Sequence, residues 1–434
     1  MGGGNVMAYE CPKIIRAHHR VWRHVWKAAL AFWLHFMPAP TLADELRILT
    51  SMSGQVFEPF KQRFEALYPE TRVIVLNKNT NAAIEEVLRG NPRGFDIFWA
   101  SSPEAFALLD RHDAFFEAPP CPEVDPNRYS VFALSGLGWS MRNDNAHTFP
   151  DSWEDLLKRE YRGRIGMARP SRSGTTHMLI ERFLQVRGWD SGWQYVLALS
   201  GNLSTLTSRS FGVPDGVLNN RFDLGLSIDF LALGAGPALR FKYGQPIMLT
   251  PARIGILKTG SNVGAGCRFI EYVLSDAGQR LLLDPQMRRV PANPAIRAEA
   301  TSQVPQAMRH ALRLTWMRYN AEVAQRRYWA VNALFDVFVT DVFSRRRGLW
   351  QRLDALTAAG NLGAVAALRT ILTTMPVAEG DGQAPGLNEA PFRATNLTTN
   401  SAPQAAALLR WRTLRDALLL EVETGLSQLE RGAR

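Results

Sequence analysis

The stretch LRILTSMSG at residues 46–54 has the pattern of a short apolar strand that runs into a loop of small polar residues. Apolar residues at helical spacing follow it and stop at Tyr68-Pro69. The same order of strand, polar loop and helix then recurs twice, with strands expected at 73–76 and 95–100. Because strands alternate with helices, the sequence predicts an α/β domain with a mostly parallel sheet.

The three predicted strands end in residues rich in Ser, Asn and Thr. Ligands bind beyond the carboxyl ends of strands in open α/β sheets. Any one of these segments is more typical of an ordinary turn or cap, but three at one sheet edge favour binding loops. The candidate binding residues at these ends are Ser53, Asn79, Ser101 and Ser102, and Ser102 is also a candidate N-cap for a helix that begins at Pro103.

A second α/β unit begins after Pro150 and is inserted into the first one. Its pattern predicts a helix from Asp151 with a Ser152–Asp155 capping box, a strand at 165–167 and a helix at 178–186. The chain then returns to the first unit through later strands. These closing elements are strands at 224–228 and 252–256, a helix at 267–283 and an extended segment at 289–292.

The character of the chain changes at about Thr301, where helical stripes of apolar residues replace the strand pattern. Residues 376–403 are rich in Pro, Gly, Asn and Thr and indicate a loop before a last helix. The tail either packs as an arm on the main body or offers a surface to a partner protein. The predicted division of the chain is 1–43 signal peptide, 44–136 and 250–300 lobe I, 137–249 lobe II, and 301–434 helical extension.

The composition is that of a folded protein that is mildly basic. The chain has 434 residues, of which 46% are hydrophobic and 21% charged, with a formal charge of +10. Residues 1–43 hold five basic side chains and one acidic one, which leaves 45 basic and 39 acidic side chains elsewhere. That excess is too small to indicate a nucleic-acid partner and suits a small anionic ligand.

The N-terminus has the order of a secretory signal. A basic segment at 13–27 precedes the apolar run 28–37, and Thr41-Leu42-Ala43 supplies small residues for cleavage. An uncleaved membrane anchor is the alternative, although the run is about half the ~20 residues that a spanning helix needs. We therefore expect export to the periplasm. Outside the signal, Cys121 and Cys267 either pair in that oxidising compartment or stay as buried thiols.

The sharpest candidate site lies immediately before the helix at 178–186. The N–H groups and the positive dipole end of a helix's first turn attract anions, and a glycine there lets the backbone approach closely. Hydroxyl groups add donors, and a guanidinium can form two hydrogen bonds with a phosphate or carboxylate. A plain helix cap beside an exposed arginine is the alternative. The residues of this segment are Ser171, Arg172, Ser173, Gly174, Thr175 and Thr176.

A second segment, Ser208-Arg209-Ser210, again joins a guanidinium to small hydroxyl residues, although it is also compatible with a solvated arginine. Asp229 follows the strand at 224–228, where it either orients the ligand or Arg172 and Arg209, or caps a helix. We expect the two arginine-bearing segments, 171–176 and 208–210, to lie at the same cleft as the polar strand ends of lobe I.

Enzyme and metal-site motifs are missing, so no catalytic residue, cofactor or metal is predicted. The remaining enzyme hypothesis is a secreted hydrolase that would use a serine with His177 and Asp229, and the absent nucleophile motif disfavours it.

Several motifs resemble those of a known family. The runs at 170–178, 188–193, 200–203 and 208–213 are similar to the bacterial extracellular solute-binding proteins of the phosphoglycerate transport regulatory type, and the likeness spans essentially the whole exported chain. The segments 151–156 and 163–165 support the wider family.

The resemblance implies a two-lobe periplasmic-binding-protein fold with strand hinges that closes on a ligand in the cleft. It also implies a phosphoglycerate-like ligand and an inner-membrane sensor kinase that induces the transporter. Only residues 171–176 and 208–210 are binding candidates because they match the family's motif. The strand-end candidates rest on the topology argument alone. The alternative is the substrate-binding component of an ABC importer, working with a permease, for another anion or a metal ion.

Overall fold

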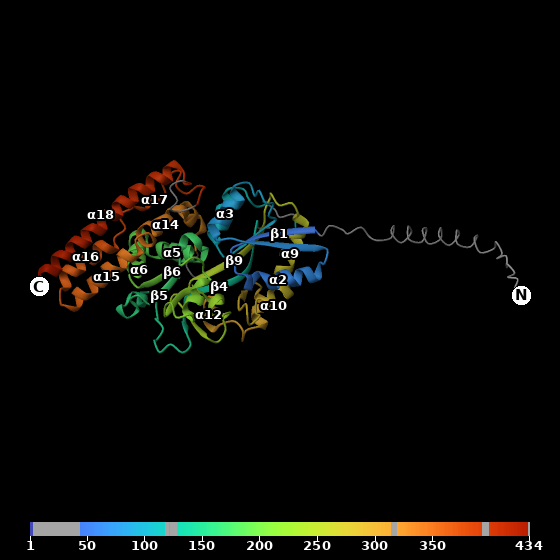
Figure 1. Ribbon diagram of the computed structural model, residues 1–434, viewed down its shortest axis with the longest axis horizontal. Helices are drawn as coiled ribbons and strands as arrows, with labels where there is room; N and C mark the ends of the chain where they lie inside the picture. The colour runs from blue at the N-terminus through green and yellow to red at the C-terminus, as the bar shows by residue number, and fades with distance from the viewer. Residues whose placement is uncertain (3–43, 118–120, 122–127, 314–318, 393–398, 433–434) are drawn as a thin grey trace. The chain divides into compact units, whose positions relative to one another are not determined.

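The computed structural model describes residues 1–2, 44–117, 121, 128–313, 319–392 and 399–432. The expected signal peptide at 1–43 therefore lies outside the described residues, apart from its first two. Residues 45–434 form one compact unit, in which the predicted two-lobe α/β architecture is present (Figure 1). We call the half with β1–β3 lobe I and the half with β5–β8 lobe II; the residue boundaries predicted for the lobes stay a prediction.

Lobe I opens with the predicted alternation of strands and helices. The apolar face of the first helix buries Phe60 and Phe64, and the Phe60 ring lies edge-on to Trp99 of the third strand at 5.5 Å. The elements are β1 (Asp44–Thr50), α2 (Gly54–Leu67), β2 (Thr71–Asn77), α3 (Thr80–Leu88), β3 (Ile97–Ala100) and α4 (Pro103–Arg111).

Two long strands cross from one half of the sheet to the other. The first half of β4 (Ser130–Arg142) pairs with β9 (Leu249–Ile256), and its second half pairs with β7 and β8 of lobe II. The strand order is β2-β1-β3-β9-β4-β7-β5-β6. β1–β3, β5–β6 and β5–β7 are parallel, whereas β9 and β4 run antiparallel to their neighbours. The expected mostly parallel sheet is thus a mixed one, because the crossing strands reverse direction at its centre.

Lobe II follows the predicted second α/β unit. The Ser152–Asp155 capping box forms, since the Asp155 N–H donates to Ser152 Oγ at 3.3 Å and the Ser152 N–H to Asp155 Oδ2 at 2.9 Å, but it begins a 3-10 turn, not a long helix. The elements are η1 (Glu154–Leu157), η2 (Arg159–Tyr161), β5 (Ile165–Ala168), η3 (Pro170–Arg172), α5 (Gly174–Arg187), α6 (Trp189–Ser200), β6 (Leu203–Thr207), α7 (Gly212–Leu218), β7 (Leu224–Ile228), α8 (Asp229–Leu233) and β8 (Leu239–Tyr243).

The chain returns to lobe I after β9. The single helix expected at 267–283 is two helices, because Ser275 ends the first and its Oγ accepts the Gly278 N–H to cap the second. Cys121 and Cys267 form a disulfide, which resolves the two open alternatives in favour of pairing. The elements are α9 (Val263–Leu274), α10 (Asp276–Leu281), β10 (Val290–Pro291) and α11 (Pro294–Glu299).

The C-terminal extension is helical, and α15, α16 and α18 share a small apolar core of their own at the red end of the chain (Figure 1). The segment expected to be a loop at 376–403 contains one short helix, α17. The elements are α12 (Gln306–Ala311), α13 (Ala321–Arg326), α14 (Tyr328–Phe335), the π-helix η4 (Asp336–Thr340), α15 (Phe343–Ala358), α16 (Leu362–Thr373), α17 (Glu379–Gly382) and α18 (Ala402–Gly432).

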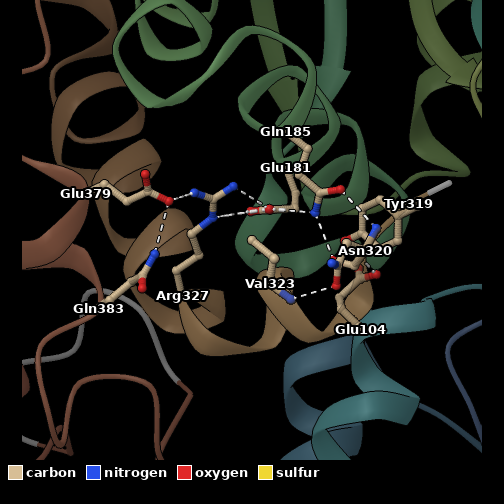
Figure 2. Close-up of polar contacts among 9 residues, drawn as sticks. All are labelled: Glu104, Glu181, Gln185, Tyr319, Asn320, Val323, Arg327, Glu379 and Gln383. Atoms are coloured by element: carbon tan, nitrogen blue, oxygen red, sulfur yellow. Dashed lines mark hydrogen bonds and ion pairs between the residues drawn. The ribbon is translucent and has the colours of Figure 1, made fainter. Parts of the chain in front are cut away.

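The extension touches both lobes through buried polar groups (Figure 2). Arg327, at the end of α13, pairs with Glu181 of α5 in lobe II at 2.7 Å, and both side chains are fully buried. Tyr319 donates its hydroxyl to Glu104 Oε2 of α4 in lobe I at 3.2 Å. The extension therefore packs on both lobes and joins them.

Candidate functional site

A small cavity lies between the strand ends of lobe I and the loops of lobe II. Its volume is about 40 Å³. Lobe I contributes Ser51, Met52, Ser53, Thr80 and Ser101 to its wall; lobe II contributes Arg172, Ser173, Gly174, Thr175, Arg209, Ser210, Phe211, Ile228, Phe230 and Leu231.

The first turn of α5 forms one side of this cavity. Ser173 is its N-cap, and its Oγ accepts the Thr176 N–H at 3.2 Å and the Thr176 hydroxyl at 3.0 Å. The same oxygen lies 2.5 Å from Ser210 Oγ, so the two hydroxyl-rich loops of lobe II touch. The Gly174 N–H, at the positive end of the helix, faces lobe I and donates to Thr80 Oγ1 at 3.1 Å.

Arg209 reaches across the cavity to lobe I. Its Nη2 donates to Asn77 Oδ1 at 2.6 Å and, at 3.4 Å, to the backbone oxygens of Ser51 and Lys78. Its guanidinium also lies over the Phe211 ring, 4.9 Å from the centroid. Burial lowers the pKa of Arg209, and the like charge of Arg172 lowers it further. An anion placed between the two guanidinium groups would relieve that repulsion.

No acidic side chain lines the cavity among the residues that the structure describes. Its polar groups are hydroxyls, backbone N–H groups and two guanidinium groups, all of which can donate hydrogen bonds to an anion. The arrangement suits capture of a phosphate or carboxylate. The described part of the chain places no group of three or more His, Cys, Asp or Glu residues together.

Eight of the candidate residues predicted from the sequence line this one cavity. They come from both lobes, as the topology argument expects: Ser53, Ser101, Arg172, Ser173, Gly174, Thr175, Arg209 and Ser210. The other six candidates lie outside its lining: Asn79, Ser102, Ser171, Thr176, Ser208 and Asp229.

Two of the residues outside the lining, Asn79 and Ser102, form local bonds within the fold. Asn79 Oδ1 accepts the Ala82 N–H at 3.0 Å and so caps α3. Ser102 precedes α4, but its hydroxyl donates to Glu104 Oε1 at 3.0 Å and makes no capping bond to the helix backbone. Through these bonds, Asn79 and Ser102 hold the loops that carry the neighbouring lining residues, Thr80 and Ser101.

Asp229 has no oxygen free for a ligand. It is fully buried, and its carboxylate accepts hydrogen bonds from the Gly136 N–H, the Phe230 N–H and the Tyr243 hydroxyl. Burial raises the pKa of Asp229 to about 6 despite these bonds. Because Gly136 is in the crossing strand β4, Asp229 fastens α8 to that strand instead of orienting a ligand.

His177 is buried below the first turn of α5. Its Nδ1 lies 3.0 Å from Asn332 Oδ1 of the extension, and burial lowers its pKa to about 3. Since neither His177 nor Asp229 lines the cavity, the arrangement does not support the hydrolase hypothesis.

Sequence reasoning missed some of the cavity wall. Thr80 directly follows the candidate Asn79 in a polar run. That run was the sequence signal that could have identified Thr80. Met52, Phe211 and Phe230 carry no sequence pattern that separates them from ordinary apolar residues.

A family model described as bacterial extracellular solute-binding protein matches residues 46–284, more than half of the chain. The chain belongs to this family. Its match covers every cavity-lining residue, and the extension lies beyond it.

A relative agrees with that assignment. This chain is 28% identical over 348 residues to the phosphoglycerate transport regulatory protein PgtC of Salmonella typhimurium. The alignment covers 77% of this chain and 86% of PgtC.

Solved structures show the same fold. The periplasmic binding protein AfuA of Actinobacillus pleuropneumoniae, solved with fructose-6-phosphate, has a TM-score of 0.59 at 18% identity and covers 68% of this chain and 98% of AfuA. The periplasmic binding protein P5PA has a TM-score of 0.56 at 17% identity and covers 64% of this chain and 93% of P5PA. Within the described residues, no helix is long and apolar enough to cross a membrane.

Proposed function

We propose that this solute-binding protein captures a small phosphorylated organic acid, of the phosphoglycerate type, in the cavity between its lobes. The observation that carries the proposal is the convergence of Arg172, Arg209 and the first turn of α5 on the polar strand ends of lobe I. The phosphate would lie against the Gly174 and Thr175 end of α5, where the helix dipole and the first-turn N–H groups favour an anion and where the phosphate would replace Thr80 as the acceptor of the Gly174 N–H. Similarity to PgtC suggests which anion to test first.

The protein works by closure, without covalent chemistry. A cavity of about 40 Å³ is too small for a three-carbon phosphorylated acid, so the ligand enters with the lobes apart and replaces contacts that they make directly. Arg209 illustrates this exchange, because its present acceptors in lobe I are neutral oxygens that a charged ligand can outcompete.

We place the protein in the periplasm. Its disulfide between Cys121 and Cys267 suits an oxidising compartment, as does the expected signal at 1–43. Its partner is an inner-membrane sensor kinase that induces the transporter. The extension supports this reading, because it bonds to both lobes and its last helix exposes Leu409, Leu414 and Leu420 to solvent.

The second candidate function is capture of a sugar phosphate for an ABC importer. The likeness in fold to AfuA, whose structure holds fructose-6-phosphate, favours it over a metal ion, for which the cavity has no acidic ligand among the described residues. Both candidates need the same phosphate subsite, so they differ in the rest of the ligand. A permease and ATPase gene pair beside this gene would favour the importer, and a kinase and regulator pair the sensor.

Calorimetric titration tests the proposal. Wild type should bind 3-phosphoglycerate more tightly than fructose-6-phosphate, and Arg172→Ala should weaken 3-phosphoglycerate about tenfold or more. Arg221→Ala, an exposed arginine of lobe II outside the cavity, is the control and should bind as wild type. Unchanged affinity in Arg172→Ala would remove Arg172 from the site, and tighter binding of fructose-6-phosphate would favour the importer.

A further inference from the structure

Arg289 is a buried guanidinium directly behind the wall of the cavity. It precedes β10 in lobe I and is 1% exposed. Its Nη2 donates to Ser101 Oγ at 3.1 Å and to Ser135 Oγ at 3.5 Å, and its Nη1 lies 3.3 Å from Met52 Sδ. Ser101 and Met52 both line the cavity. The guanidinium is therefore one side chain away from the ligand space.

Arg289 makes no ion pair among the described residues, although the buried carboxylate of Asp229 lies near enough to raise its pKa. Its Nε has no hydrogen-bond partner in the same part of the chain. The nearby carboxylate of Asp229 is occupied by two backbone N–H groups and Tyr243. Burial lowers the pKa of Arg289 to about 10. A buried charge held by hydroxyls and a thioether is unfavourable unless another group completes its surroundings.

A comparison with Arg346 shows what the surroundings of Arg289 lack. Arg346 is equally buried and also has no ion pair among the described residues, but it donates to the backbone oxygens of Leu197 and Leu372, at 3.3 and 2.8 Å. Carbonyl oxygens are good acceptors, whereas the thioether of Met52 is a weak one. The fold supplies hydrogen-bond acceptors for the guanidinium of Arg346, whereas Nε of Arg289 has none among the described residues.

Two aromatic rings cover Arg289, and the ring of Phe132 in β4 lies 5.3 Å from the guanidinium. The ring of Phe230, in α8 of lobe II, lies over the guanidinium with its centroid 4.1 Å away, and Phe230 itself lines the cavity. Because Phe230 itself lines the cavity, a displacement of its ring would open Arg289 to the cleft. An entering ligand would then meet this charge from the side opposite α5.

We propose that Arg289 binds the carboxylate of the ligand, so that the cleft selects molecules with a phosphate at one end and a carboxylate at the other. The proposal rests on the proposed function, and it names a specificity determinant that lies outside the family motifs in lobe II. Lobe II holds the phosphate through α5 and Arg172, and lobe I holds the acid through Arg289. Closure then requires both anionic groups, which separates phosphorylated acids from simple phosphate esters.

Two ligands that differ in the carboxylate test this. Wild type and Arg289→Gln are titrated with 3-phosphoglycerate and with glycerol 3-phosphate, which keeps the phosphate but lacks the acid. We expect Arg289→Gln to lose about 10- to 100-fold in affinity for 3-phosphoglycerate and to bind glycerol 3-phosphate within about threefold of wild type. Arg346→Gln is the matched control and should leave the ratio of the two affinities unchanged.

The outcomes are distinct. An equal loss for both ligands in Arg289→Gln, or no loss for either, overturns the role of Arg289 while the proposed function stands. Failure of wild type to bind 3-phosphoglycerate overturns both. If Arg289→Gln does not fold, Arg289→Lys, which keeps the charge but loses the planar fork, should still lower the preference for 3-phosphoglycerate several-fold, and an unchanged preference would contradict the assignment.

Discussion

The backbone N–H of Gly174 in lobe II donates a hydrogen bond to Thr80 Oγ1 in lobe I at 3.1 Å. This contact needs a residue without a side chain, because a Cβ at position 174 would lie 2.6 Å from both Cβ and Oγ of Ser102. The glycine that exposes the end of α5 to an anion is thus also the one that lets lobe I approach it.

Gly174→Ala should weaken binding by obstructing closure, without removing any group that touches the ligand. We expect a loss in affinity of about tenfold or more, since forcing a methyl group into such a contact typically costs about 1–3 kcal/mol. Calorimetry with 3-phosphoglycerate gives the affinity, and small-angle scattering shows whether ligand still compacts the protein.

Gly348→Ala is the control for that variant, because a Cβ there meets no atom within 4 Å. It lies inside α15, where alanine favours the helix, so it should bind as wild type. Normal affinity and normal compaction in Gly174→Ala would contradict the steric argument.

The ion pair between Arg327 and Glu181 should be a main fastening of the extension to lobe II. Arg327→Met leaves Glu181 buried without its partner, which should lower the free energy of unfolding by about 3–5 kcal/mol. Glu379, the other carboxylate on Arg327, is 44% exposed, so Glu379→Gln should change stability by less than about 1 kcal/mol. Urea unfolding of the full chain measures both, and similar losses in the two variants would refute this ranking.

Stability should depend on pH through Glu104. Full burial raises its pKa from 4.5 to about 7, although Ser102 and Tyr319 donate hydrogen bonds to the carboxylate. Between these pH values the folded protein holds a proton that the unfolded chain has released, so the contribution of Glu104 to stability falls as pH rises through this window.

The test compares wild type with Glu104→Gln, which has no charge to lose. The free energy of unfolding of wild type, relative to the variant, should fall by about 3 kcal/mol between pH 4.5 and pH 7. The comparison cancels other titrating groups such as His177, whose lowered pKa acts in the opposite direction. A difference that stays constant over this range would show that Glu104 does not titrate there.

The disulfide should contribute strongly to the stability of lobe I, because it closes a long segment of the chain. Its cysteines are 146 residues apart, and replacing both with serine should lower the free energy of unfolding by about 2–5 kcal/mol. Thermal melting with and without a thiol reductant measures the effect. The reductant should destabilise wild type and leave Cys121→Ser/Cys267→Ser unchanged; equal melting of oxidised and reduced wild type would contradict the prediction.

Local pattern was enough to predict the first strands and helices of lobe I and much of the cavity wall. Ser53 and Ser101 follow strands with clear apolar runs, and Arg172 to Thr175 lie at the start of a helix with a serine cap. Such signals lie within a few residues of one another in the sequence. The topology rule for α/β sheets then places these ends together without any knowledge of side-chain packing.

The remaining features depend on contacts between distant parts of the chain. A polar residue after a strand has the same sequence signal whether it caps a helix, as Asn79 does, or faces a ligand. The burial of Asp229 by Gly136 and Tyr243, and of Arg289 by Phe230, is fixed by tertiary packing alone. The crossing of β4 and β9, which makes the sheet mixed, is likewise a long-range pairing.

Native mass spectrometry of the protein purified without refolding tests the central claim most directly, because a bound ligand shows its own mass. We predict an added mass that matches a small phosphorylated acid in wild type and is lost in Arg172→Ala/Arg209→Ala. A wild-type protein that carries a metal ion or a neutral solute, or an adduct that the double variant keeps, would contradict the account.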